Sequence, residues 1–215
     1  MQKTPLYYLH VKLHGKMHDY FGYALPSSYE AGAEKEREKA KNDCGLFDAS
    51  FLGELELAGE KPAETLEKVF GAKFSELAVG HIQNATLFGE NVDVYHVAKN
   101  VFMIVVAPSV HEKTVKFIRE NLVGKTTLLD ISNALGAVLV KGAKAKEILS
   151  SVMKVPENVN SFSTVVVKDA SCIVADTKAG FLIACNFQKI KAVYEEIALV
   201  GIPKGMIPCG TDAMN

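Results

Sequence analysis

Hydrophobic and polar positions follow helical and strand periods in turn along the chain. Residues 62–70 place Leu66, Val69 and Phe70 on one helical stripe, and Gly71 follows where that helix would end. Residues 102–107 form an almost continuously apolar run, which is typical of a central strand. The same patterns predict helices over 29–44, from Ser109 onward, 144–152 and 188–199, and strands over 53–57, 82–88, 92–97, 126–131, 134–141, 164–168, 172–175 and 180–185.

This order of elements predicts an α+β fold. Groups of strands and single helices alternate through both halves of the chain, which favours two packed units built on antiparallel sheets. We expect two intertwined subdomains, roughly 1–130 and 131–215. In the helix over 29–44, opposite charges stand three and four residues apart, as on a solvated helix face. Gly45 then occupies the position expected of a helix C-cap.

Composition narrows the function classes. The chain has 215 residues and 48% hydrophobic content, enough for one substantial core or two small ones. Its 24 Lys and Arg balance 25 Asp and Glu, which disfavours nucleic acid or an anionic membrane as a partner. The four cysteines lack Cys-x-x-Cys spacing, so we expect buried free thiols and no metal site. Without a secretory signal or a long apolar run, the predicted location is cytoplasmic.

An ordered series of short motifs runs through the segment 1–59. The motifs read Thr4-Pro5-Leu6-Tyr7, His10, Gly15-Lys16-Met17, Gly22, Pro26, Tyr29, Gly45-Leu46-Phe47-Asp48-Ala49-Ser50 and Gly53-Glu54-Leu55. The series resembles the aminomethyltransferase of the glycine cleavage system, the T-protein, which hands a one-carbon unit to tetrahydrofolate. The resemblance implies interlocked ferredoxin-like halves. The final segment 208–215 resembles the family's Pro-Cys-Gly-Leu-Gly-Ala-Arg-Asp, so we expect a short form without the C-terminal barrel domain.

The resemblance also places the candidate catalytic residues. The family stabilises a developing iminium-like cation with a carboxylate at a strand start that reads Asp-Asp-Leu-x-Val-Tyr. The matching stretch here runs from Glu90 to Tyr95, and the second Asp falls on Asn91. An amide carries no charge and takes no proton near neutral pH. Glu90 and Asp93 are the carboxylates available as substitutes, with Asp93 expected to face away from the core. The candidate catalytic residues are Asn91 and Glu90.

Folate contacts of the family fall on four residues of this chain. They are Leu52, Asn84, Tyr95 and Ala107. Leu52 replaces a family methionine, and Ala107 stands where the family has asparagine. We expect a cleft near Leu52, Asn91 and Tyr95, with a more apolar floor than in the family.

Two further family contacts are altered. The loop that carries a pterin-binding glutamate is shortened here to 176–181, and Met214 stands at the position of a folate-contacting arginine. Each lost buried polar partner costs about 1–3 kcal/mol, and micromolar affinity amounts to only about 8 kcal/mol. The sequence therefore predicts weakened tetrahydrofolate binding and reduced or absent aminomethyl transfer.

Three classes of function stay open. The first is a working aminomethyltransferase, completed by oligomerisation or by a separate partner chain. The second is a non-catalytic subunit that binds a lipoyl carrier protein or other glycine-cleavage subunits, or that belongs to a sarcosine-oxidase-like complex. The third is an altered enzyme that uses the same cleft for another methylated or aminomethylated substrate.

Overall fold

The computed structural model describes residues 1–214, and they group into two units. Unit 1 comprises 1–51, 134–159 and 163–215, and unit 2 comprises 52–133 and 160–162. The sequence predicts subdomains of roughly 1–130 and 131–215, whereas the structure joins the segment 1–51 to the C-terminal part. The physical reason is strand pairing, because the strand that ends at Asp48 pairs with the strand that contains Val138.

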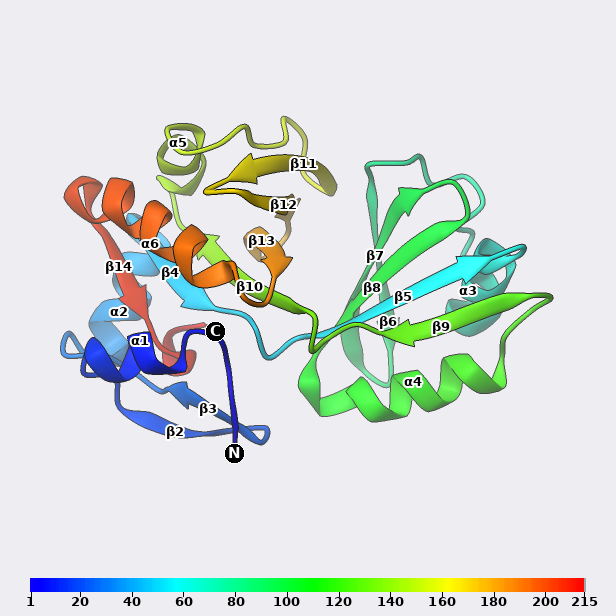
Figure 1. Cartoon of the computed structure of the whole chain (residues 1–215), viewed down its shortest axis with the longest axis horizontal. Helices are drawn as coiled ribbons and strands as arrows, with labels where there is room; N and C mark the ends of the chain where they lie inside the picture. Colours follow the sequence, from blue (N-terminus) through cyan, green and yellow to red (C-terminus); the bar gives the residue numbers. More distant parts are fainter. Residues whose placement is uncertain (215) are drawn as a thin grey trace. The chain divides into compact units, whose positions relative to one another are not determined.

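Unit 1 is built on a six-stranded sheet with the order β11-β12-β13-β10-β4-β14 (Figure 1). Its strands are β4 (Cys44–Asp48), β10 (Leu135–Lys141), β11 (Ser161–Val167), β12 (Ala170–Thr177), β13 (Gly180–Asn186) and β14 (Met206–Cys209). From β12 through β13 and β10 to β4 the neighbours pair antiparallel, and β14 joins β4 in parallel. A three-stranded sheet of β1 (Gln2–Lys3), β3 (Tyr23–Pro26) and β2 (Met17–Tyr20) completes the strands of this unit.

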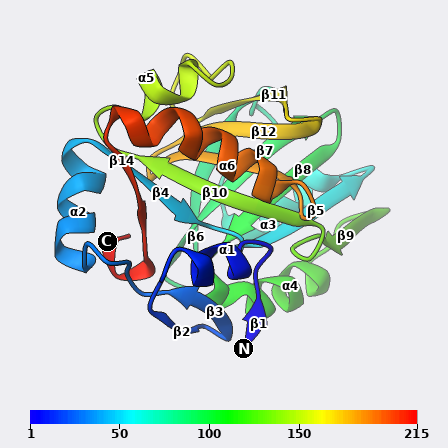
Figure 2. The ribbon, with the colours of Figure 1, turned by 60° about the vertical axis from the view of Figure 1, so that its left-hand side comes forward.

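Helices cover both faces of the six-stranded sheet. They are α1 (Tyr7–Lys12), α2 (Ala33–Asn42), α5 (Ala145–Ser150) and α6 (Ile190–Gly201), with short turns η2 (Ile202–Lys204) and η3 (Thr211–Ala213). Figure 2 shows α6 lying along the sheet, where Val193 and Ile197 enter a core shared with Val138 of β10. On the other face, Ala40 of α2 packs with Phe47 of β4.

Gly45 differs from its predicted role. It lies in β4 and not at a helix C-cap, which is Asp43. A Cβ at Gly45 would stand 2.7 Å from the Cβ of Ala40. The glycine therefore lets α2 pack closely on the strand, a requirement of tertiary contact that the local pattern does not reveal.

Unit 2 is a five-stranded antiparallel sheet in the order β6-β7-β8-β5-β9. Its elements are β5 (Gly53–Gly59), α3 (Pro62–Phe70), β6 (Ile82–Leu87), β7 (Glu90–Ala98), β8 (Val101–Val106), η1 (Pro108–Val110), α4 (His111–Glu120) and β9 (Thr126–Asp130). Helix α3 has the predicted bounds and ends at Gly71 in the left-handed conformation, with φ of 67°. Leu66 and Val69 of α3 and Ile118 of α4 share a core with the sheet.

The described chain confirms two further predictions. The chain has a mixed α and β architecture, and no barrel is present in residues 1–214. All four cysteines are buried and free. In the same residues, every helix is too short or too polar to cross a membrane.

Candidate functional site

The sheet of unit 2 separates an apolar face from a polar one. Side chains alternate along β7, so Val92 and Val94 enter the core beneath the helices and both are fully buried. Asn91, Asp93 and Tyr95 therefore share the opposite face, as the sequence predicts for Asp93. A tight turn, Phe88–Gly89, joins β6 to β7 with positive φ at both residues. This turn sets the register that pairs Asn91 with Thr86.

A row of three polar residues crosses this face. Asn84 on β6 is paired with Asp93 on β7, Asp93 with Val105 on β8, and Val105 with Glu54 on β5. The side-chain amide of Asn84 donates a hydrogen bond of 2.6 Å to Oδ1 of Asp93. Asn84, a predicted folate contact, thus holds a carboxylate on the face that carries Asn91.

Tyr95 is a buried phenol with an unused hydroxyl. The side chain is 0% exposed, and its ring packs against Phe162 with 5.4 Å between ring centroids. Among the described residues, no group forms a hydrogen bond with its hydroxyl. Burial raises the pKa of Tyr95 well above its usual range, and the nearby carboxylates of Asp93 and Glu54 add to the effect. Since buried polar groups are normally satisfied, this neutral hydroxyl is suited to a ligand.

Glu54 contributes a second carboxyl to the same face. It is only 3% exposed, and burial raises the pKa of its carboxyl well above the usual range, with Asp130 adding to the shift. The backbone N–H of Glu54 donates to Oγ of Ser132 at 2.9 Å, which fixes the start of β5. The polar face therefore combines a carboxylate at Asp93 with groups at Glu54 and Tyr95 that resist ionisation.

The other predicted site residues lie at the ends of strands. Asn91 is exposed near the start of β7. Glu90 lies on the same face of β7 as Val92, and its Oε1 accepts a hydrogen bond from Ser109 at 3.3 Å. Leu52 is half-buried just before β5, and Ala107 follows β8 and packs at the edge of the core. Strand alternation therefore places Glu90 and Asn91 on different faces.

A cluster that sequence reasoning missed joins α4 to the end of β9. Nε2 of His111 lies 3.0 Å from Oδ2 of Asp130 and 3.4 Å from Oγ of Ser132, which itself donates to Asp130 Oδ1 at 2.6 Å. Because serine and aspartate meet the same ring nitrogen, the histidine cannot relay a proton between them as in a hydrolase triad. A hollow of about 420 Å³ beside it is lined by charged residues of α4, including Lys116 and Arg119. The cluster therefore has a structural role, because its contacts connect α4 to the end of β9.

The residues of the N-terminal motifs form a buried polar chain in unit 1. Oδ2 of Asp48 accepts from Thr4 Oγ1 at 2.7 Å and lies 2.9 Å from Nε2 of His10. Nδ1 of His10 lies 2.7 Å from the hydroxyl of Tyr29. The backbone N–H of Ser50 donates to the other oxygen of Asp48 at 2.9 Å. These contacts link α1 and β4 to the segment that follows β3.

The C-terminal motif is fixed in the same unit. Glu36, fully buried on α2, accepts hydrogen bonds from the backbone N–H groups of Tyr29 and Gly210 at 2.6 and 2.8 Å. Lys141 donates to the carbonyl of Met214. Met214 thus provides a backbone contact within unit 1, and the last residue of the motif, Asn215, lies outside the described residues.

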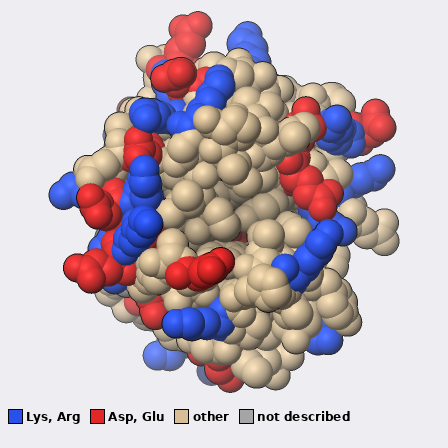
Figure 3. All heavy atoms as spheres, turned by 90° about the vertical axis from the view of Figure 1, so that its left-hand side faces the viewer, with Lys and Arg blue, Asp and Glu red and all other residues tan. Residues whose placement is uncertain are grey.

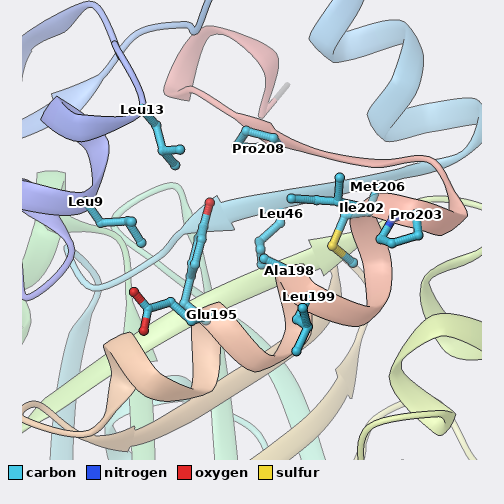
Figure 4. A pocket seen from close by; sticks show the side chains of 11 residues that line it. Leu9, Leu13, Leu46, Glu195, Ala198, Leu199, Ile202, Pro203, Met206 and Pro208 are labelled. Atoms are coloured by element: carbon cyan, nitrogen blue, oxygen red, sulfur yellow. The ribbon is translucent and has the colours of Figure 1, made fainter.

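A hollow of about 390 Å³ opens on unit 1 between α1, α6 and β14 (Figure 4). Leu9 and Leu13 face Ala198 and Leu199 across it, and Leu199 is 70% exposed. Figure 3 looks onto the left-hand side of Figure 1 and shows uncharged side chains at the centre with charged ones around them. The side chains that line this hollow are mainly aliphatic, so it offers apolar contact to a ligand and few polar groups. No group of three or more His, Cys, Asp or Glu within residues 1–214 is placed to hold a metal ion.

Comparison with known sequences gives one consistent result. A family model described as the GCVT N-terminal domain matches residues 6–215. An aminomethyltransferase of Bacillus cereus is 28% identical over 229 residues, an alignment that covers all of this chain and 62% of the relative. The aminomethyltransferase of Bacillus cytotoxicus is also 28% identical over the same shares. The chain thus spans less than two thirds of these curated relatives.

Solved structures agree on the fold. The glycine cleavage system aminomethyltransferase T from Bartonella henselae superposes with a TM-score of 0.88 at 19% identity, over 99% of this chain and 60% of that one. A chain of the heterotetrameric sarcosine oxidase from Corynebacterium sp. U-96, solved with pyrrole 2-carboxylate, gives a TM-score of 0.65 at 14% identity. That match covers 95% of this chain and 96% of the other. The predicted α+β fold is confirmed.

Proposed function

The chain belongs to the GCVT N-terminal domain family, and on that premise we propose that it binds a reduced folate in one-carbon metabolism, with reduced or absent aminomethyl transfer. The observation that carries the proposal is the polar face of unit 2. It keeps Tyr95 buried with a hydroxyl that has no hydrogen-bond partner among residues 1–214, while the family's carboxylate position is taken by the exposed amide of Asn91. A binding group is retained and the charge at Asn91 is lost.

Tetrahydrofolate is the ligand that the family resemblance implies. Tyr95 supplies a donor, and Leu52 and Ala107 offer apolar contact at the ends of β5 and β8. The side-chain amide of Asn84 is engaged with Asp93 and so contributes through that carboxylate. Affinity is weakened because an alanine and a methionine, at 107 and 214, stand where the family has polar contacts.

The reduced aminomethyl transfer that we propose follows from the absence of a carboxylate at position 91. The attack of a folate nitrogen on the lipoyl-bound aminomethyl carbon releases ammonia and develops positive charge, which a fixed carboxylate stabilises. Loss of one such preorganised group costs about 10²–10³-fold in rate. The site residues proposed for this step are Asn91, Glu90 and Asp93. Asn91 accepts and donates hydrogen bonds but carries no charge.

The test is an aminomethyl-transfer assay with purified chain, the lipoyl-bound intermediate and tetrahydrofolate, in which ammonia release is followed. We expect wild-type turnover at least about 10²-fold below an ordinary T-protein, and an increase in the Asn91→Asp variant. Glu76→Gln serves as a control, because its side chain is 78% exposed and lies on a turn of unit 2 outside the strands of the polar face. Wild-type turnover equal to that of an ordinary T-protein would refute the proposal.

A second candidate is a partner-binding subunit without chemistry. It is supported by the match to a sarcosine oxidase chain of nearly the same length, since that match covers 96% of the other chain. On this alternative, the chain associates with a lipoyl carrier protein or with another subunit of such a complex, or forms an oligomer. Sedimentation of the chain with and without a lipoylated carrier protein distinguishes the two candidates, because only the second requires a stable complex when no folate binds.

A further inference from the structure

We propose that Asp93 is the carboxylate of the folate site in this protein, displaced by two residues along β7 from the family position at Asn91. This inference rests on the proposed function and adds the group that recognises the ligand. Successive residues of a strand rise about 3.3 Å and alternate in direction. Asp93 therefore shares the face of Asn91 and stands about 7 Å further along the strand, next to Tyr95.

Alternation distinguishes Asp93 from the other acidic candidate. Glu90 shares the parity of Val92 and Val94, whose side chains fill the core beneath the helices. Its carboxylate is exposed and accepts from Ser109, which lies in η1 just before α4. Glu90 is thus on the helical side of the sheet. Asp93 is the acidic residue of β7 that shares a face with the unused hydroxyl.

Three polar side chains surround Asp93 on this face of the sheet. Asn84, its partner across the strands, donates to Oδ1 at 2.6 Å and fixes the orientation of the carboxylate. Tyr95 stands two residues further with a buried hydroxyl that lacks a partner in the described part of the chain. Glu54 lies in the same row, and burial disfavours its charge. Asp93 is half-buried, so it is the more accessible of the two acidic residues in this row.

This arrangement fits a ligand that presents N–H groups to Asp93 and an acceptor to Tyr95. A reduced pterin ring carries N–H groups at N5 and N8 that the oxidised ring lacks. Hydrogen bonds from such donors to a carboxylate are roughly twice as strong as those between neutral groups. We therefore assign to Asp93 the preference for the reduced ligand, and to Asn84 the role of a positioning residue.

Calorimetric titration of the full chain with tetrahydrofolate, and separately with folic acid, tests the assignment. We expect wild type to bind tetrahydrofolate more tightly than folic acid. Asp93→Asn should weaken tetrahydrofolate binding at least about tenfold, the loss of one charge-assisted contact, with little change for folic acid. Asn84→Ala should lower the same preference by a smaller factor. Glu76→Gln, which changes an exposed carboxylate on a turn outside these strands, should leave both affinities unchanged.

The possible results distinguish failure of the Asp93 assignment from failure of the proposed function. If wild type binds tetrahydrofolate and Asp93→Asn binds it equally well, the assignment is wrong while the proposed function stands. Equal weakening for both ligands would also overturn it, because a structural role affects them alike. If Glu90→Gln alone removes the preference, the carboxylate is Glu90. If wild type binds neither ligand, the proposed function fails and the assignment fails with it. Partial recovery of the preference in the Asp93→Asn, Asn91→Asp double variant would support the assignment further.

Discussion

Replacement of Asp48 by alanine should destabilise unit 1 severely. The carboxylate accepts from the hydroxyl of Thr4 and the N–H of Ser50, and contacts the ring of His10. The side chains of His10 and Asp48 are 0% and 1% exposed, so the donors that Asp48 satisfies lie away from bulk solvent. Removing one member of a buried polar pair of this kind costs about 3–5 kcal/mol. Whole domains have stabilities of only about 5–15 kcal/mol.

Urea unfolding followed by far-ultraviolet circular dichroism measures this loss. With a urea dependence of about 2 kcal/mol per molar, the midpoint of Asp48→Ala should fall by roughly 1.5–2.5 M. Tyr29→Phe removes only the hydrogen bond to His10 and should cost about 1 kcal/mol. Asp169→Asn is the matched control, since Asp169 is an exposed residue of a turn in the same unit. A midpoint of Asp48→Ala within about 0.3 M of wild type would show that the buried network does not hold the unit together.

Three other predictions concern titration and burial. The folded-state pKa of Glu54 is raised above the ordinary 4.5, so wild-type stability should fall as pH rises from 4.5 through the raised pKa. Glu54→Gln should remove that slope and gain thermal stability relative to wild type at pH 8 but not at pH 4; an unchanged slope would contradict it. Hydrogen bonds from Lys144 and Lys39 lower the pKa of Asp43 from 3.8 to about 2. Its stabilisation is present above pH 3.8 and lost toward pH 2, so Asp43→Asn should lower the melting temperature at pH 7 and leave it equal to wild type near pH 2. Iodoacetamide at pH 8 should label none of the four buried thiols in the native protein and all four after denaturation, as mass spectrometry can count; rapid native labelling would show that a cysteine is accessible.

Local signals explain which elements the sequence predicts well. Helix α3 is predicted residue for residue, because Pro62 stands at its start and Gly71 adopts the left-handed conformation at its end. The early strands β1 to β3 and the late strand β14 are not predicted. Each of them is very short, and β14 pairs with β4, which lies in the first quarter of the chain. Strands this short have too little periodicity to stand out.

The candidate site, too, was predictable from sequence only where local signals mark it. The stretch from Glu90 to Tyr95 could be located by its resemblance to a family motif, and alternation placed Asp93 on the outer face. The contact between Asn84 and Asp93 depends on the register across the Phe88–Gly89 turn, which the sequence alone does not specify. The rise in the pKa of Glu54 depends on burial by tertiary structure. The family motif therefore predicts which residues form the candidate site, whereas their contacts and burial depend on tertiary packing.

Unit 2 interrupts unit 1 as a nearly continuous insertion that runs over 52–133. Its two ends are held together, since Ile131 donates a backbone hydrogen bond to Glu54. During synthesis the segment 52–133 emerges from the ribosome before β10, the strand that pairs with β4. Unit 2 can therefore fold during synthesis, while β4 must wait with an unpaired edge for the second half of the chain. The order of the chain therefore separates β4 from both of its neighbours in the sheet, β10 and β14, until the second half of the protein has emerged.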